Sequence, residues 1–245
     1  MSPEAHPEVP PRPRATWSWW EVLAVYLVAN VVGVLVLAPL VPWLRSRGLV
    51  QLAGTIVADV VILMVFVAWL GWRHPGWRSV IRWPDRPVVE AGYGLLVGSA
   101  LAFVILTFVA PFLEWILRRA SGRQIQAPRQ LPGGLTGGRA LLAIALAAVA
   151  APIVEEFVFR GCLYRALRDR FGVAMGVVAS GIVFGLVHYV PRGSAGGRVL
   201  LMAAVGVFGM GLALIHERRG NLVANTAAHM VFNIVGLAQL LSMIR

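Results

Sequence analysis

Long apolar blocks dominate this sequence and constrain its fold more than any other feature. Of its 245 residues, 58% are hydrophobic and only 13% are charged, and the apolar residues run in blocks rather than in the narrow stripes of a soluble helix. A helix needs roughly 20 apolar residues to cross the hydrocarbon core of a bilayer, and several blocks meet that length almost without charge. The sequence therefore predicts an all-α, polytopic integral membrane protein.

The blocks divide the chain into a short tail and one transmembrane helix bundle. Residues 1–16 hold five Pro and two Arg and are predicted to be a disordered N-terminal tail. Residues 17–245 form the bundle, in which we expect an intramembrane polar cavity. The loop 118–139 has room for a short interfacial helix, so we expect about seven to eight spans. The seven blocks are 17–40, 49–72, 88–117, 139–168, 173–190, 199–216 and 221–243.

The net charge of +11 comes from 22 arginines and no lysine. These arginines stand between the apolar blocks, where they anchor helix ends at lipid headgroups. We therefore expect the bilayer, and no nucleic acid, as the partner of this charge. Positive loops favour the cytoplasmic side. The face with a slight excess of arginine is therefore predicted to lie in the cytoplasm. It carries Arg165, Arg168, Arg170, Arg218 and Arg219.

Few ionisable side chains fall inside the predicted spans, where burying a charge is costly and each such group calls for a partner or a function. Among the histidines and acidic residues, those well inside a span are Asp59, Glu155, Glu156, His188 and His229. No role for Asp59 follows from the sequence.

Estimated depths bring polar residues of three spans to overlapping levels in the membrane. At a rise of roughly 1.5 Å per residue, Glu155 lies about 20 Å below the face where the fourth and fifth spans join, and His188 about 22 Å. His229 and Asn233 come to about 12 and 18 Å from the same face. We therefore expect these side chains to meet.

Spacing within single helices adds two pairs. Glu156 and Arg160 stand at i and i+4, in the order that favours an ion pair in which Arg160 neutralises and orients Glu156. His229 and Asn233 have the same spacing and point from one helix face. Pro152 removes a backbone hydrogen bond just before the glutamates, which predicts a kink or opening there.

These residue types suit peptide hydrolysis, which needs an activated water, a proton for the leaving amine and donors to the developing oxyanion. Glu155 is the candidate general base and His188 holds or polarises the water. His229 and Asn233 are the candidate oxyanion donors.

The same side chains also suit a catalytic divalent metal such as zinc, with Glu155, His188 and His229 as its ligands. The sequence leaves the metal-free and the metal-assisted version open. It lacks the H-E-x-x-H pattern of familiar metalloproteases.

Three segments in this order resemble the motifs of one family. Residues 155–161 match E-E-x-x-F-R-G, residues 184–188 match F-x-x-x-H, and residues 229–233 match H-x-x-x-N. Together they resemble the CPBP intramembrane proteases, also called the Abi or type II CAAX prenyl endopeptidase family, over about residues 139–243. The resemblance implies that Glu155 is the catalytic base, that His188 assists it, and that His229 and Asn233 form the oxyanion site. Members are commonly classed as metalloproteases.

The resemblance also implies substrates: prenylated CAAX proteins in eukaryotes, and bacteriocins or peptide pheromones in bacteria. The lysine-free usage, rich in Arg, Ala, Val and Gly, looks like that of a bacterium with a GC-rich genome. We therefore expect a multi-pass protein of a bacterial inner membrane that acts on a membrane-associated protein or peptide.

Other interpretations use the same residues differently. Glu155, Glu156 and Arg160 can form a purely structural ion pair, and interhelical hydrogen bonding, the role expected for Asn225, also accounts for His229 and Asn233. A proton-coupled transporter would use the carboxylates and imidazoles as a relay, although no inverted repeat is evident. A catalytically inactive scaffold or immunity protein is the remaining alternative.

Overall fold

The computed structural model describes residues 14–46, 49–125, 142 and 145–242. Every regular element in these ranges is helical, which confirms the all-α prediction. In chain order the elements are α1 (Trp19–Leu37), η1 (Ala38–Leu40), α2 (Val41–Ser46), α3 (Val50–Arg73), η2 (Trp77–Ile81), α4 (Pro87–Val104), η3 (Ile105–Val109), α5 (Ala110–Ser121), η4 (Leu146–Ala150), α7 (Ala151–Glu156), η5 (Phe157–Tyr164), α8 (Arg165–Phe171), α9 (Val173–Val187), α10 (Ala195–Arg219) and α11 (Leu222–Ser242).

Consecutive elements join into long helical rods that follow the predicted spans to within a few residues at most ends. Within the described ranges, four rods are long and apolar enough to cross a membrane, namely Trp19–Ser46, Leu52–Arg73, Pro87–Ser121 and Ala195–Arg219. Val173–Val187 and Leu222–Gly236 are shorter apolar helices. The chain is therefore a multi-pass membrane protein, and the full count of seven to eight spans stays a prediction.

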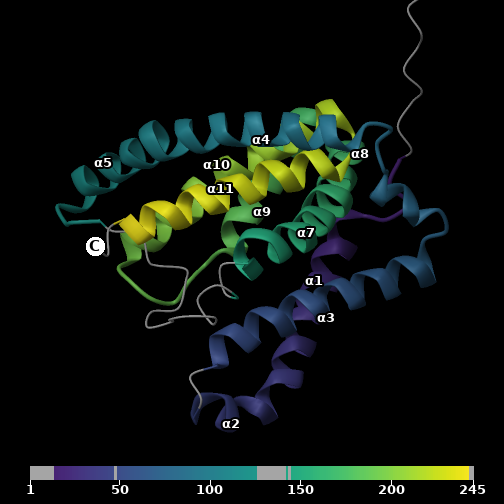
Figure 1. Ribbon diagram of the computed structural model, residues 1–245, viewed down its shortest axis with the longest axis horizontal. Helices are drawn as coiled ribbons and strands as arrows, with labels where there is room; N and C mark the ends of the chain where they lie inside the picture. The colour runs from purple at the N-terminus through teal and green to yellow at the C-terminus, as the bar shows by residue number, and fades with distance from the viewer. Residues whose placement is uncertain (1–13, 47–48, 126–141, 143–144, 243–245) are drawn as a thin grey trace, which may run out of the picture.

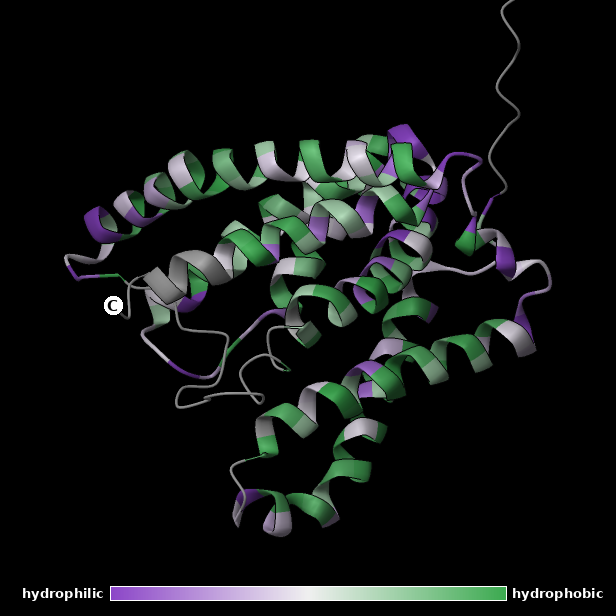
Figure 2. Cartoon of the chain, viewed as in Figure 1, coloured by the Kyte–Doolittle hydropathy of each residue, from purple (hydrophilic) through white to green (hydrophobic). Residues whose placement is uncertain are grey.

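Hydrophobic residues cover most of each helix, whereas hydrophilic residues gather at the helix ends and connecting loops (Figure 2). A helix satisfies its own backbone hydrogen bonds, and lipid offers no water to satisfy them otherwise. An apolar block of this length therefore has no stable alternative to a helix inside a bilayer.

Glycines bring two helix pairs into close contact. On α9, a Cβ added to Gly181 would meet the carbonyl oxygen of Gly206 on α10 at 2.8 Å. On α4, a Cβ added to Gly98 would lie 2.5 Å from Cα of Ala228 on α11. Small residues allow this approach of backbones in membranes, where close packing drives helix association. The neighbour of Ala228 is His229, so this contact also sets the rotation of the helix that carries it.

The first helices form a hairpin of α1 and α3, whose α2 end points away from the other helices (Figure 1). The hairpin meets the rest of the bundle mainly through α7 and η5. Just before α1, the buried indole of Trp17 donates from Nε1 to the carbonyl oxygen of Cys162 in η5, over 3.0 Å. The N-terminal segment is thereby fixed to the helix that carries the two glutamates.

Two predictions fall largely outside the described residues. Of the predicted tail, only residues 14–16 are described, and the backbone N–H of Ala15 donates to Asp169 over 2.7 Å. Of the loop 118–139, the described part continues α5 to Ser121, and the possible interfacial helix lies in the undescribed remainder.

Candidate active site

The rod with the two glutamates departs twice from α-helical geometry. A π-helical turn, η4, ends two residues before Pro152, near the place where the sequence predicts a kink or opening. A second π-helical stretch, η5, begins directly after Glu156. π-Helical turns widen a helix locally and are frequent at functional sites. They bracket the pair Glu155 and Glu156.

Glu156 lies at the centre of a buried charge network. Its Oε1 accepts from Nη1 of Arg160 at 3.1 Å and from Nδ1 of His229 at 2.8 Å. These side chains are 0%, 1% and 3% exposed, so the charges have no bulk water to stabilise them. Arg160 also donates from Nη2 to the carbonyl oxygen of Gly209, over 3.0 Å. The predicted pair of Glu156 and Arg160 is thus present, and His229 joins it.

His188 lies at the C-terminal cap of α9, not inside the helix as the predicted span 173–190 placed it. The helix ends at Val187 because the chain turns into a loop that leads to Pro191 and Gly193, two residues that disfavour helix continuation. Nδ1 of His188 is 2.7 Å from the carbonyl oxygen of Phe184. A carbonyl only accepts, so Nδ1 carries the hydrogen and Nε2 is left facing the site.

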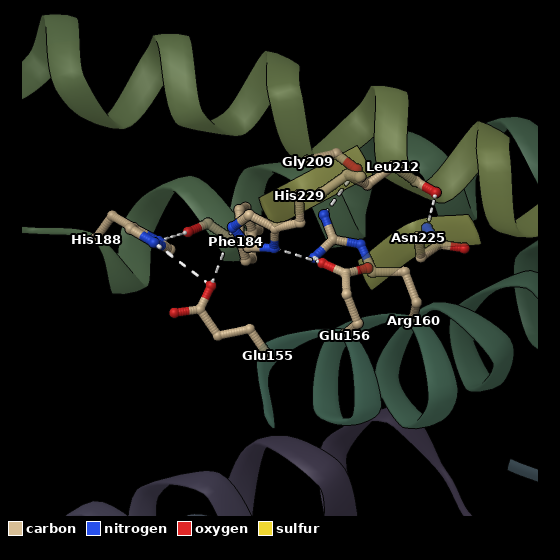
Figure 3. A network of polar contacts seen from close by, with 9 residues as sticks. All are labelled: Glu155, Glu156, Arg160, Phe184, His188, Gly209, Leu212, Asn225 and His229. Carbon is tan, nitrogen blue, oxygen red and sulfur yellow. Dashed lines mark hydrogen bonds and ion pairs between the residues drawn. The ribbon is translucent and has the colours of Figure 1, made fainter. Parts of the chain in front are cut away.

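Glu155 faces both imidazoles (Figure 3). Its Oε2 lies 3.8 Å from Nε2 of His188 and 3.7 Å from Nε2 of His229. These separations exceed direct hydrogen-bond length, and Oε2 is buried without a hydrogen-bond partner among the described residues. Three polar side-chain atoms therefore converge on one gap, across separations that a bridging water can span.

Two asparagines flank His229 by one helical turn on α11. Asn225 is fully buried and donates from Nδ2 to the carbonyl oxygen of Leu212 at 2.7 Å, which is the interhelical role expected for it. Asn233 lies one turn beyond His229 and is half-buried. Its assignment as an oxyanion donor stays a prediction.

The side chains proposed as metal ligands lie close together, but their arrangement is not that of a preformed metal site. Glu155, His188 and His229 present one oxygen and two nitrogens to the same gap. Nevertheless, within the described ranges no three His, Cys, Asp or Glu side chains are arranged as a metal-binding group. The donor chemistry fits a divalent ion such as zinc.

Sequence reasoning missed the roles of Phe184 and Gly209. The carbonyl of Phe184 holds His188, and its ring lies 4.2 Å from the guanidinium carbon of Arg160, within cation–π range. The F-x-x-x-H spacing contains this signal, because residues four apart share a helix face. Gly209 contributes only a backbone carbonyl, which no sequence pattern marks.

The comparison with known families agrees with the motifs. Residues 137–235 match the family model described as type II CAAX prenyl endopeptidase Rce1-like. No curated protein and no solved structure matches the chain significantly. The matched segment contains α7, η5, α9, α10 and most of α11, and so contains every residue of the network in Figure 3. Over residues 137–235, the chain is therefore similar to the Rce1-like family, in agreement with the resemblance of its three motifs to the CPBP proteases.

Proposed function

We propose that this protein is an intramembrane endopeptidase that hydrolyses a peptide bond in a membrane-associated protein or peptide. The observation that carries the proposal is the carboxylate of Glu155, which faces Nε2 of both His188 and His229 at 3.8 and 3.7 Å. The similarity to the Rce1-like family supports a protease of the CAAX type in general.

The hydrogen bonds that each histidine already makes determine which of its ring nitrogens faces the gap. Nδ1 of His188 is held by a carbonyl and Nδ1 of His229 by Glu156, so each histidine presents Nε2. A water between Glu155 and His188 donates one hydrogen to each. Its oxygen lone pair then remains available for attack.

In the proposed reaction, the water oxygen attacks the carbonyl carbon of the scissile bond while Glu155 takes a water proton. The carbonyl π electrons move to the oxygen, which accepts from Asn233 and from a protonated His229. When the tetrahedral intermediate collapses, the C–N bond breaks and Glu155 returns its proton to the leaving amine. The products are a carboxylic acid and an amine, and Glu155 is regenerated.

The proposed reaction uses His229 as an imidazolium, because Nε2 can donate only in that form while Nδ1 donates to Glu156. Glu155 and Glu156 are two negative charges, and Arg160 supplies one positive charge. An imidazolium at His229, hydrogen-bonded to Glu156, brings the sum to zero, which lowers the cost of burying the group. Glu156 then orients and stabilises that imidazolium, as the carboxylate does in an Asp-His catalytic pair.

A divalent metal is the alternative source of water activation. Glu155, His188 and His229 would hold it, and it would act as a Lewis acid that makes its bound water more acidic. His229 must be neutral to bind a metal, unlike in the metal-free version. Only the metal-assisted version needs the ion, so only that version is sensitive to a chelator.

The substitution Glu155→Gln tests the proposal. Removing a general base typically costs a factor of about 10² to 10⁴ in rate. The matched control is Glu114→Gln, which alters a glutamate paired with Arg118 on α5, away from the site. The measurement is cleavage of a quenched fluorescent peptide library by the purified protein in detergent, with and without a chelator. We expect the control to cleave at the wild-type rate and the Glu155 variant to lose activity.

Equal cleavage by both variants contradicts the assignment of Glu155. Absence of cleavage by the wild type, together with proton flux in liposomes that Glu155→Gln abolishes, favours the transporter instead. Absence of both activities leaves the inactive scaffold. The bacterial inner membrane is the location we propose, from the residue usage of the chain.

A further inference from the structure

A cavity of about 140 Å³ lies where the N-terminal hairpin meets the helix of the glutamates. Both carboxylates Asp59 and Glu155 line it, from α3 and α7 respectively. Its other lining residues are Tyr26, Asn30, Ala58, Ile62, Val154, Val158 and Phe159. Glu155 therefore borders the cavity as well as the gap that it shares with the two histidines.

Asp59 stands in the middle of the apolar helix α3. Its Oδ2 is buried and has no hydrogen-bond partner among the described residues. An unpaired carboxylate is costly inside a bilayer unless water or a cation meets it. Asp59 lines a cavity, and water in that cavity would satisfy the carboxylate.

The cavity has both the room and the polar groups to hold water. One water occupies about 30 Å³ in the liquid and needs two to four polar partners. Asp59, Asn30, Tyr26 and Glu155 are the polar residues of the lining. Asn30 uses its Nδ2 on the carbonyl of Tyr26 at 2.8 Å, which leaves its side-chain oxygen as an acceptor. An apolar cavity would stay dry, whereas this lining favours several ordered waters.

We propose that this cavity holds the water that reaches Glu155 for hydrolysis, and that Asp59 is the positioning residue that keeps it hydrated. The inference rests on the proposed function. Each peptide bond cleaved consumes one water, and the catalytic gap lies among apolar helices, so a replacement must come from a nearby store. Asp59 accepts hydrogen bonds from these waters and takes no proton in the reaction. It also lies outside the Rce1-like segment, so the N-terminal hairpin would complete the site.

Hydroxyl-radical footprinting with X-ray pulses measures the water independently of catalysis, because radicals formed from bound water oxidise the side chains beside it. Phe159 lines the cavity and is only 3% exposed, so its oxidation reports internal water. Phe66 on α3 is 0% exposed, lies outside the lining and serves as the dry reference. We expect oxidation of Phe159 well above that of Phe66 in the wild-type protein.

Two substitutions then separate hydration from charge. Asp59→Asn still accepts hydrogen bonds, so we expect Phe159 oxidation to persist and kcat to stay within about 3-fold of wild type. Asp59→Leu removes the acceptor, so oxidation should fall to the Phe66 level and kcat should fall on the order of 10- to 100-fold at unchanged KM. Ser99→Leu on α4, another polar-to-leucine change within a span, is the control and should alter neither readout.

Ala58→Leu tests the same inference if Asp59→Leu fails to fold, because a leucine there fills the cavity and leaves Asp59 in place. Phe159 oxidation no higher than that of Phe66 in the wild type overturns the inference. Loss of oxidation with unchanged kcat, in either cavity variant, also overturns it, because the hydrolytic water then comes from elsewhere. Full activity of Glu155→Gln instead overturns the proposed function, and the footprint remains interpretable in that case.

Discussion

At the residue scale, the buried ion pair of Glu156 and Arg160 depends on several partners at once. Arg160 contacts Glu156, the carbonyl of Gly209 and the ring of Phe184, while Glu156 also holds His229. Breaking a buried pair by removing one member leaves a charge that nothing neutralises. The network therefore makes stability and catalytic geometry depend on the same contacts.

Replacing Arg160 by methionine should destabilise the protein strongly. Glu156 is 0% exposed and would lose its guanidinium partner, which costs about 3–5 kcal/mol for a buried pair. Unfolding in detergent by chemical denaturant measures this loss. The double variant Glu156→Gln with Arg160→Met removes both charges and should recover part of the stability. If the double variant loses as much stability as Arg160→Met and Glu156→Gln lose together, the two residues are not coupled.

The asparagines on either side of His229 allow a structural role of an asparagine to be compared with a catalytic one. Asn225→Ala loses an interhelical hydrogen bond to Leu212, which should lower the free energy of unfolding by roughly 1 kcal/mol and leave kcat unchanged. Asn233→Ala removes a proposed oxyanion donor and should lower kcat about 10²- to 10³-fold. Peptide cleavage and unfolding are measured on both variants. A larger loss of kcat in Asn225→Ala would reverse the two roles.

At the element scale, the position of His229 depends on how closely α11 packs against α4. Gly94 and Gly98 on α4 face Ala224 and Ala228 on α11, with no room for a further methyl group. The backbones cannot yield as a flexible side chain would. A change in this contact between α4 and α11 is therefore expected to move the helix that carries His229 and Asn233.

Gly98→Ala should destabilise the bundle, because its Cβ would lie 2.5 Å from Cα of Ala228. Overpacking of this kind costs about 1–3 kcal/mol. Gly92→Ala is the matched control on the same helix, because a Cβ there meets nothing within 4 Å. Alanine favours helix over glycine, so the control should be neutral or slightly stabilising. Thermal unfolding in detergent compares the two variants, and equal melting temperatures would contradict close packing of α4 against α11.

The helices and the polar cluster were predictable from the sequence for physical reasons. Apolar length defines a membrane helix, and i,i+4 spacing predicts the pair of Glu156 and Arg160. Details set by contacts between distant segments were not predictable. The π-helical stretch η5 after Glu156 has no local sequence signal of this kind. Likewise, the partnership of Glu156 with His229 joins residues 73 positions apart.

At the scale of the whole molecule, the ends of α8 and α10 share one face of the bundle. Arg168 near the end of α8 pairs with Glu217 near the end of α10, with 3.5 Å between Nη1 and Oε2. The loop after α9 lies at the other end, because α10 runs 25 residues between its two ends. Figure 1 shows α10 running along the length of the bundle. Five arginines assigned to one face by sequence therefore lie at the same end of the bundle, namely Arg165, Arg168, Arg170, Arg218 and Arg219.

The positive-inside rule then predicts which side faces the cytoplasm. Cys162 is 0% exposed and is the only cysteine, so an introduced cysteine can be labelled against little background. Arg170→Cys lies at the arginine-rich face and Arg192→Cys in the loop after α9, and both positions are exposed. In intact bacterial cells, a membrane-impermeant maleimide should label only Arg192→Cys, and after lysis it should label both. The reverse pattern in intact cells would place the ends of α8 and α10 outside the cytoplasm.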